Sequence, residues 1–286
     1  MHVPETLAVL GRRPDGAAWL SSLPDLLDAC VERWDLDLGA PYEGGTSGYV
    51  APVTRGDSTP AVLKVQWPHR EAEHEADALR WWDGRGAVRL LDHDPDRHAL
   101  LIEHCDPGTQ LAASPPDVAV GVIIGLVRQL CTPAPEGFDR LEDECPRWGD
   151  EIPRSWERAG RPFERSLVDR AVGHLDELAP TQGPSVLLHQ DLHGDNVLAA
   201  EREPWLAIDP KPLVGELEFA PTPVIRSAEL GHSRAAVRYR LDRCCDELDL
   251  DRERTRGWAF AHTMAWAFQG DHVLAGHLQT ARWLTD

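Results

Sequence analysis

Lysine and long apolar runs are both scarce in this sequence. Lys64 and Lys211 are the only lysines among 29 basic residues. No stretch of the sequence provides the roughly 18 consecutive apolar residues that a membrane-spanning helix needs. Residues 1–16 also lack the apolar region of a secretory signal. We therefore expect a cytoplasmic protein without a membrane partner.

Positive charge is outnumbered by negative charge. The chain has 29 Lys and Arg against 48 Asp and Glu, a formal net charge of −19. Because so acidic a surface repels phosphate backbones, we expect no nucleic-acid partner. The same charge would suit a cationic substrate, although keeping the protein in solution is an equally simple reason for it.

The cysteines show neither the C-x-x-C spacing of a redox pair nor histidines at zinc-ligand spacing. We therefore expect free, buried thiols. The six cysteines lie at positions 30, 105, 131, 145, 244 and 245.

The remaining composition is typical of a globular protein. Of 286 residues, 42% are hydrophobic and 27% charged, with a mean hydropathy of −0.38, which allows one large domain or two modest ones. Arginine is a wide planar fork, whereas lysine is a compact point charge. The two lysines are therefore candidates for sites that a fork would not fit.

The pattern of the chain changes from mostly strands to mostly helices near residues 105–108. We expect an α+β fold with two lobes. The N-terminal lobe (1–105) would hold a small antiparallel sheet and one helix, and the C-terminal lobe (106–286) would be mostly helical. Helical periodicity covers 17–38, 69–83, 117–130, 163–178, 226–247 and 252–283.

A glycine cluster precedes the second predicted strand. Gly44, Gly45 and Gly48 permit a backbone that folds over phosphates, and Ser47 at the tip could donate to one of them. Three glycines are a weak signal when taken alone. The strand 61–65 that follows carries Lys64.

Polar residues bracket a second hairpin, in the helical part of the chain. Asp191 and Asn196 lie at its mouth, and Asp209 lies at the end of its far strand. Carboxylate and amide oxygens of this kind are able to hold a hard divalent cation.

The order of these parts matches that of protein kinases: glycine loop, strand lysine, helix glutamate, linker, catalytic loop, metal-binding aspartate. The segment HQDLHGDN (189–196) fits the H-x-D-L-x-x-x-N spacing of the catalytic loop. Together with AIDPKPLVGE (207–216) and VLKVQWPH (62–69), it resembles the aminoglycoside phosphotransferases, in particular the streptomycin 6-kinase and hydroxyurea phosphotransferase branch. The resemblance covers about residues 40–215. It implies that the N-terminal lobe (1–105) binds the nucleotide and that the C-terminal lobe (106–286) is the catalytic and substrate-binding lobe.

The resemblance implies roles for individual residues. Asp191 would be the catalytic base, and Asn196 and Asp209 would bind Mg²⁺. Lys64 would contact the ATP phosphates, oriented by Glu75. Glu71, one helical turn earlier, is the competing partner.

Further roles follow from the same resemblance. Glu103 and Cys105 would offer backbone groups to adenine, as a kinase linker does. His189 and His193 would brace the catalytic loop, and a contact of His193 with substrate is an alternative. Lys211 would reach either a phosphate or a nearby carboxylate.

After residue 215 the chain departs from the pattern, because Glu216 or Glu218 stands where relatives carry an aspartate. This places the acceptor in doubt. Carboxylates that could attract a cationic acceptor gather in 139–151 and 246–251, although a solvated face is the more ordinary reading of such charge runs.

The implied function is ATP- and Mg²⁺-dependent phosphorylation of a hydroxyl on a small cationic molecule, first of all a streptomycin-type aminoglycoside, which would give antibiotic resistance. We expect a monomer. A kinase of another small alcohol or of hydroxyurea is one alternative, and a pseudokinase that only binds nucleotide is another. The intact set Lys64, Asp191, Asn196 and Asp209 argues against the pseudokinase.

Overall fold

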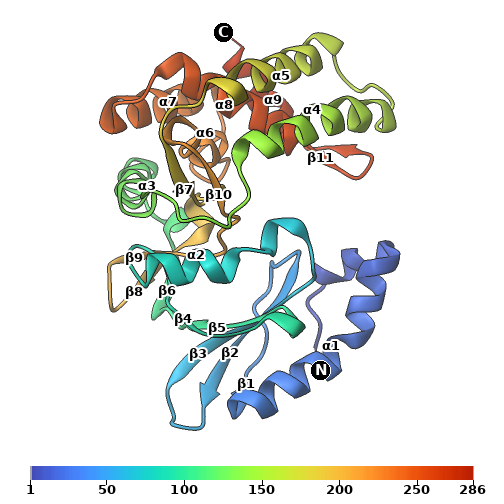
Figure 1. Ribbon diagram of the computed structural model, residues 1–286, viewed down its shortest axis with the longest axis vertical. Helices are drawn as coiled ribbons and strands as arrows, with labels where there is room; N and C mark the ends of the chain where they lie inside the picture. Colours follow the sequence, from blue (N-terminus) through green and yellow to red (C-terminus); the bar gives the residue numbers. More distant parts are fainter. Residues whose placement is uncertain (1, 286) are drawn as a thin grey trace. The chain divides into compact units, whose positions relative to one another are not determined.

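The computed structural model describes residues 2–285 and divides into two compact units, Met1–Gly108 and Thr109–Asp286. The first unit is built around an antiparallel sheet, and the second is mostly helical, as the blue-to-green and green-to-red parts of Figure 1 show. The strand β6 (Pro107–Gln110) carries the chain from one unit to the other.

The sheet of the first unit has the strand order β1-β2-β3-β5-β4, with every neighbouring pair antiparallel. Its central strand β3 is covered on both faces, because all residues of β3 after Pro60 are buried. The strands are β1 (Leu36–Leu38), β2 (Gly48–Arg55), β3 (Pro60–Gln66), β4 (Leu90–Asp94) and β5 (Ala99–Glu103).

Alternation along β3 assigns its side chains to two faces. Ala61, Leu63 and Val65 belong to a core cluster with the helix α1 (Pro14–Trp34) and the short 3-10 helix Leu7–Arg12. Val62, Lys64 and Gln66 must point to the opposite face, the side of the helix α2 (Glu75–Trp82). The apolar alternation of this strand thereby places a buried lysine beside α2.

The second unit packs helices around α8 (Arg252–Ala265), whose residues from Gly257 to Met264 are all buried. Alanine and glycine on α8 allow α5, α6, α7 and α9 to approach it closely. The other helices are α3 (Pro116–Leu130), α4 (Leu141–Arg158), α5 (Arg165–Leu178), α6 (Thr222–Arg226), α7 (Arg234–Leu248) and α9 (Ala275–Leu284).

Short antiparallel pairs complete this unit. The strand β7 (Ser185–Leu188) pairs with β10 (Leu213–Glu216), and β8 (Val197–Ala200) forms a hairpin with β9 (Trp205–Ala207). The loop from β7 to β8 is the polar segment 189–196. The predicted second hairpin is therefore present.

Two helix predictions near the C-terminus are wrong in their extent. The range 252–283 contains two helices, because the hairpin of β11 (Phe268–Gln269) and β12 (His272–Val273) interrupts it at Gly270, where φ is +65°. The range 226–247 is also divided. The helix α6 ends at Arg226, and α7 begins after Ser233, whose side chain accepts the amide N–H of Ala236 as an N-cap.

The helix α4 is absent from the sequence-based prediction, because Pro146 and Pro153 interrupt its periodicity. All six cysteines are free, five of them buried and Cys131 half-buried, as expected. Within residues 2–285, every helix is too short or too polar to span a bilayer.

Candidate active site

The first unit brings Lys64 and Glu75 together in a buried ion pair. The Lys64 Nζ lies 2.8 Å from Oε1 and 2.7 Å from Oε2 of Glu75, and the two residues are 7% and 1% exposed. Gln66, two residues along β3 on the same face, donates its side-chain amide to the same carboxylate. Both charges are thus held in a defined geometry away from bulk water.

The structure distinguishes between the two glutamates considered as the lysine partner. Glu75 is the first residue of α2 and points to the sheet, whereas Glu71 is exposed in the 3-10 turn Arg70–Ala72. Burial of Ala76, Leu79 and Trp82 orients α2 so that Glu75 faces β3.

The glycine cluster forms the loop that enters β2. Gly44 has a φ of +101°, and a Cβ at Gly48 would lie 3.2 Å from the carbonyl of Val65, so both positions favour glycine. The carbonyl of Ser47 accepts the amide N–H of Trp67 at 2.9 Å. The loop is therefore tied to the end of β3, three residues beyond Lys64.

The two residues expected to contact adenine lie at the end of the same sheet. Glu103 is the last residue of β5, and its carboxylate accepts the amide N–H of Arg89 at 2.9 Å. Cys105 is buried two residues later. Their proposed backbone contacts with a nucleotide stay a prediction.

In the second unit, His189 braces the loop that follows β7. Its Nε2 donates to the carbonyl of Ile208 at 3.1 Å, and its Nδ1 accepts the amide N–H of Asp191 at 3.3 Å. This pair of bonds requires a neutral ring, and burial lowers the pKa of His189 to about 4. Gln190 takes a φ of +64°, a left-handed conformation that turns the chain immediately before Asp191.

Asp191 is buried among hydrogen-bond donors. Lys211 Nζ lies 2.6 Å from Oδ2, Asn196 Nδ2 lies 3.2 Å from the same oxygen, and Arg226 Nη2 lies 3.4 Å from Oδ1. Burial alone would raise the pKa of this carboxyl, but the surrounding positive charges, Lys211 first, outweigh burial and lower the pKa. The side chain is therefore an ionised carboxylate with both oxygens held.

Asn196 and Asp209 fit a divalent cation by the atoms they present. The amide nitrogen of Asn196 donates to the backbone carbonyl of Asp191 at 3.0 Å, which leaves its Oδ1 for a ligand. The amide N–H of Ile208 donates to the carbonyl of Asn196 at 3.0 Å, which pairs these two residues across the hairpin. Asp209 comes directly after this pair. An amide oxygen beside a carboxylate is the donor type that Mg²⁺ takes in proteins.

Lys211 links the Asp191 carboxylate to that of Asp209. Its ammonium lies 3.1 Å from Oδ2 of Asp209 as well as 2.6 Å from Asp191. Burial would lower its pKa, but the two carboxylates raise it above the usual value. Of the two targets that the sequence left open for Lys211, the structure shows contacts with carboxylates.

Sequence reasoning missed Arg226 and the loop around it. Arg226 lies at the end of α6, its Nη1 2.7 Å from Nδ1 of His262 and its guanidinium 4.3 Å from the ring centroid of Trp266. Three residues on, Glu229 accepts the amide N–H of Gly194 at 3.0 Å and lies 3.1 Å from Nδ1 of His193. These residues are about 35 positions from the loop they support, so no local spacing could reveal them.

One buried arginine organises that missed loop. Arg240 on α7 is 1% exposed and donates to the backbone carbonyls of Ile225, Ser227, Leu230 and Gly231 at 2.7–3.2 Å. Burial lowers its pKa to about 10, so the group stays charged at neutral pH. The segment that carries Arg226 and Glu229 is thus shaped by one guanidinium.

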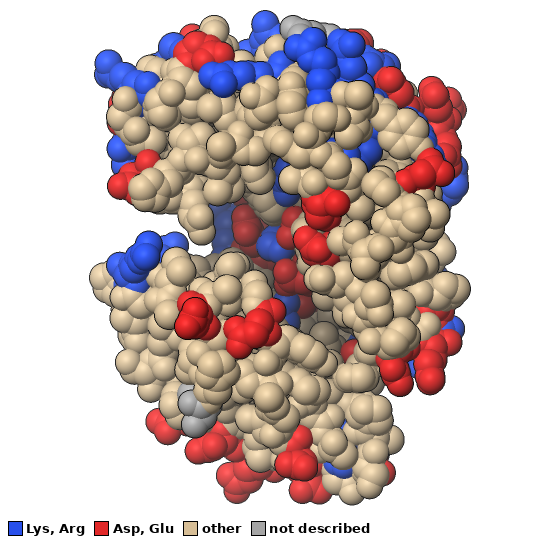
Figure 2. Space-filling model, turned by 180° about the vertical axis from the view of Figure 1, so that it is seen from behind, with Lys and Arg blue, Asp and Glu red and all other residues tan. Residues whose placement is uncertain are grey.

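The carboxylate clusters that could have attracted a cationic acceptor are largely engaged. In α4, Glu142 pairs with Arg140, Asp150 with Arg154, and Glu151 with Arg158, at 2.5–3.2 Å. In the second cluster, Glu247 pairs with Arg243 and Asp251 caps α8. On the face drawn in Figure 2, acidic and basic side chains neighbour each other at several places. These clusters are charged faces of helices.

Glu216 has a structural position. It is 1% exposed in β10, where its carboxylate binds Arg254 at 2.6 Å, Trp258 of α8 and the amide of Gly183. Glu218 lies in the following 3-10 turn. The Glu216 carboxylate therefore ties β10 to α8, whereas the donors around Asp191 come from other segments.

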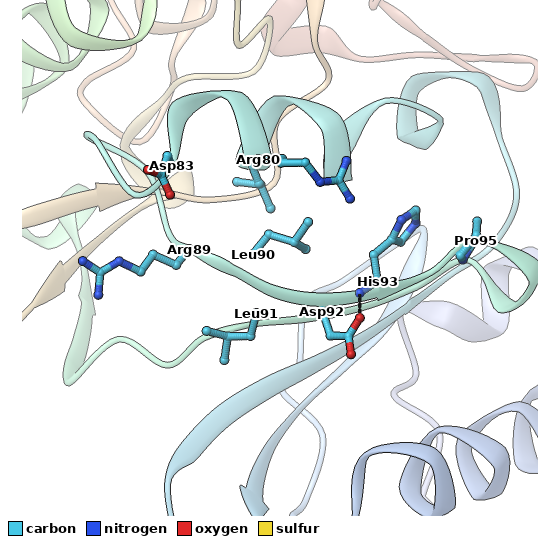
Figure 3. Close-up of a pocket in the computed structure, with 9 residues that line it drawn as sticks. Arg80, Asp83, Arg89, Leu90, Leu91, Asp92, His93 and Pro95 are labelled. Atoms are coloured by element: carbon cyan, nitrogen blue, oxygen red, sulfur yellow. Dashed lines mark hydrogen bonds between the residues drawn. The ribbon is translucent and has the colours of Figure 1, made fainter.

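A surface pocket of about 540 Å³ lies in the first unit, between α2 and β4. Figure 3 shows Leu90 and His93 directed toward α2, with Leu91 and Asp92 on the opposite side of the strand. A β-bulge between Leu90 and Asp92 produces this arrangement. The lining of the pocket includes none of the predicted site residues.

Comparison with known proteins assigns the family. A family model described as aminoglycoside/hydroxyurea antibiotic resistance kinase matches residues 33–272. The chain belongs to this family. Streptomycin 6-kinase of Streptomyces griseus is 40% identical over 274 residues, which cover 92% of this chain and 89% of that protein. Hydroxyurea phosphotransferase of Kitasatospora aureofaciens is 38% identical over 271 residues, which cover 92% of this chain and 78% of that protein.

The fold is that of a wider group. Choline kinase LicA from Streptococcus pneumoniae aligns with a TM-score of 0.64 at 11% identity, over 92% of this chain and 99% of that chain. So low an identity shows the fold alone. This member of the aminoglycoside/hydroxyurea kinase family therefore has a protein-kinase-like fold, and the predicted fold class and enzyme class, a small-molecule phosphotransferase, are confirmed.

Proposed function

We propose that this kinase is an ATP- and Mg²⁺-dependent O-phosphotransferase whose acceptor is a small cationic molecule, a streptomycin-type aminoglycoside. One observation carries the proposal. In a member of this kinase family, Asp191 is an ionised carboxylate held by Lys211 at 2.6 Å in the loop directly after β7, with Asn196 beside it. A kinase needs a phosphoryl donor, and we propose ATP for that role.

Asp191 is the base in this proposal. Its carboxylate accepts a hydrogen bond from the acceptor hydroxyl while that oxygen attacks the γ-phosphorus of ATP. The bond from the γ-phosphorus to the bridging oxygen breaks, ADP leaves, and the hydroxyl proton passes to Asp191. Because its pKa is lowered, the carboxylate chiefly orients the hydroxyl and takes the proton only as the new P–O bond forms.

The phosphate-side residues have separate roles. Lys64, held by Glu75, contacts the α- and β-phosphates, and the loop with Gly44, Gly45, Ser47 and Gly48 offers donors to them. Glu103 and Cys105 offer backbone groups to adenine. Asn196 and Asp209 would hold Mg²⁺, which when bound neutralises charge on the phosphates.

Two observations favour a cationic aminoglycoside as the acceptor. The formal net charge of −19 favours the approach of a cation. The streptomycin 6-kinase named above is 40% identical to this chain, in an alignment that covers 89% of that kinase. Hydroxyurea is the second candidate, because a hydroxyurea phosphotransferase is 38% identical. The two acceptors differ in charge, so they can be separated experimentally.

A transfer assay with purified protein tests the proposal. Labelled ATP and Mg²⁺ are supplied with streptomycin, other aminoglycosides, hydroxyurea and neutral small alcohols. We expect labelled streptomycin to form fastest and with a KM that rises with ionic strength, because salt screens the attraction between cation and protein. Faster transfer to hydroxyurea or to a neutral alcohol would overturn the choice of acceptor. Absence of transfer to every acceptor would favour the pseudokinase.

The variant Asp191→Asn separates chemistry from binding. It keeps the shape of the side chain but removes the proton acceptor, so transfer should fall by about a hundredfold or more. The affinity for MgATP should stay close to that of wild type, because Asp191 acts on the acceptor. Retention of a tenth or more of the activity would exclude Asp191 as the base.

A further inference from the structure

The N-terminal strap, which we define as residues 2–13, is attached to the glycine loop. The Thr6 hydroxyl donates to the carbonyl of Gly45 at 2.7 Å, across 39 positions of sequence. A threonine directly before a helix ordinarily caps that helix, yet Thr6 makes no such bond to the 3-10 helix Leu7–Arg12. Its hydroxyl is used on the loop instead.

The strap is a packed part of the first unit. Leu7 and Leu10 are buried in the core cluster of α1 and the sheet. The strap packs closely against the start of α1 at Gly16, where a Cβ would lie 2.3 Å from the carbonyl oxygen of Leu10. Thr6 is therefore held in place independently of the loop that it contacts.

A second contact links the strap to the other end of the loop. The guanidinium of Arg13 lies 4.6 Å from the ring centroid of Trp67, whose amide N–H donates to the carbonyl of Ser47. Trp67 also stacks on His69, with ring centroids 5.5 Å apart. The Gly45 carbonyl is thus bound by the strap directly, and the Ser47 carbonyl is bound by a residue whose ring the strap contacts.

The bond to Gly45 also orients the next amide. In a trans peptide the carbonyl and the N–H point in opposite directions. With the Gly45 carbonyl bound to Thr6, the N–H of Thr46 is directed away from the strap. Within residues 2–285 no acceptor is found for this N–H.

We infer that Thr6 is a positioning residue for nucleotide binding: it holds the peptide from Gly45 to Thr46 so that the Thr46 amide is presented to an ATP phosphate. This inference rests on the proposed function, which assigns the glycine loop to the phosphates. The strap lies outside residues 33–272, the part that the family model matches. The cost of ordering a glycine-rich loop is met before the nucleotide arrives, which increases affinity.

Calorimetric titration with MgATP alone tests the inference and needs no acceptor. Thr6→Val removes the hydroxyl and keeps the shape, so Kd should rise by about threefold to tenfold, the value of one hydrogen bond. Thr6→Ser restores the hydroxyl and should bind as wild type does. Thr59→Val, which loses a hydroxyl bonded to Asp57 in the exposed turn before β3, is the matched control and should leave Kd unchanged.

Thermal melting of each variant accompanies the titration, because a merely structural role of Thr6 would lower Tm without changing Kd. Should Thr6→Val fail to fold, Arg13→Met tests the second contact, with a smaller rise in Kd expected. Lys64→Met tests the proposed function in the same assay. If Lys64→Met loses MgATP and Thr6→Val binds like wild type, the inference alone is wrong. If wild type does not bind MgATP, the proposed function and the inference both fail.

Discussion

At the scale of single residues, each of the two lysines of the chain holds a carboxylate. Lys64 pairs with Glu75, and Lys211 bridges Asp191 and Asp209. In a chain that otherwise uses arginine, both positions bring a compact ammonium within 2.8 Å of a carboxylate oxygen. At Lys211 the ammonium lies between the carboxylates of Asp191 and Asp209, a position that suits a compact point charge better than a wide planar guanidinium.

Replacement of Lys211 should slow the reaction. Lys211→Met removes the charged donor on Oδ2 of Asp191, and a hydrogen bond between charged groups contributes roughly 1.5–3 kcal/mol, so kcat should fall by about ten- to a hundredfold. Steady-state transfer to whichever acceptor the transfer assay identifies measures kcat. Lys211→Arg keeps the charge and should restore only part of kcat. A kcat within twofold of wild type for Lys211→Met would show that Asn196 and Arg226 suffice.

The pair Lys64–Glu75 should control nucleotide affinity. Glu75→Gln leaves the ammonium buried without its ionic partner, so the MgATP Kd should rise by about tenfold and Tm should fall. Titration and thermal melting of the variant measure both. The matched control is Glu71→Gln, on the exposed turn before the same helix, which should change neither quantity. A larger effect from Glu71→Gln would mean that the glutamate partner is misassigned.

At the scale of secondary-structure elements, the predictable parts are those encoded locally. The strand lysine, the loop 189–196 and the end of the hairpin at Asp209 are read from spacing, because each lies within a few residues of its own motif. The support from α6 and α7 is not predictable in this way. Arg226 reaches Asp191 across 35 positions, and a contact at that distance leaves no periodic trace in a single sequence.

The loop between α6 and α7 should depend on Arg240. Arg240→Met keeps much of the apolar stem but leaves the buried carbonyls of Ile225, Ser227 and Leu230 without this donor, each at a cost of about 1–3 kcal/mol if water does not replace it. We expect the free energy of unfolding to fall by about 3 kcal/mol or more in urea titrations. Arg238→Met, on the exposed face of α7, is the control and should change it little. Equal stability of the two variants would contradict the organising role of Arg240.

At the scale of the whole molecule, the kinase family could be predicted from the sequence and the acceptor could not. Order along the chain identifies a kinase, because each functional residue occupies a fixed place in a shared plan. Charge runs that resemble a cation site in the sequence are paired with arginines in the folded chain, as Glu151 is with Arg158. From composition alone, at most the chemical class of the acceptor can be inferred.

Buried histidines should make the stability of the whole molecule depend on pH. Burial lowers the pKa of His189 and of His277 to about 4, and that of His262 well below its usual value. Each is neutral when folded but takes a proton when unfolded, so the stability it contributes is present above about pH 6.5 and is lost as pH falls toward 4. Between pH 7 and pH 5 a histidine with a folded pKa of about 4 should cost about 2 kcal/mol.

His193 opposes this trend. Burial alone would lower its pKa, but its hydrogen bond to Glu229 raises it, so His193 favours the folded state as pH falls. One such group does not offset three. We therefore expect the free energy of unfolding, measured by urea titration, to be several kcal/mol lower at pH 5 than at pH 7. His189→Gln should reduce that difference by about 2 kcal/mol. His272→Gln, in the exposed hairpin, is the control, and the same stability at both pH values in wild type would contradict the neutral, buried state of these rings.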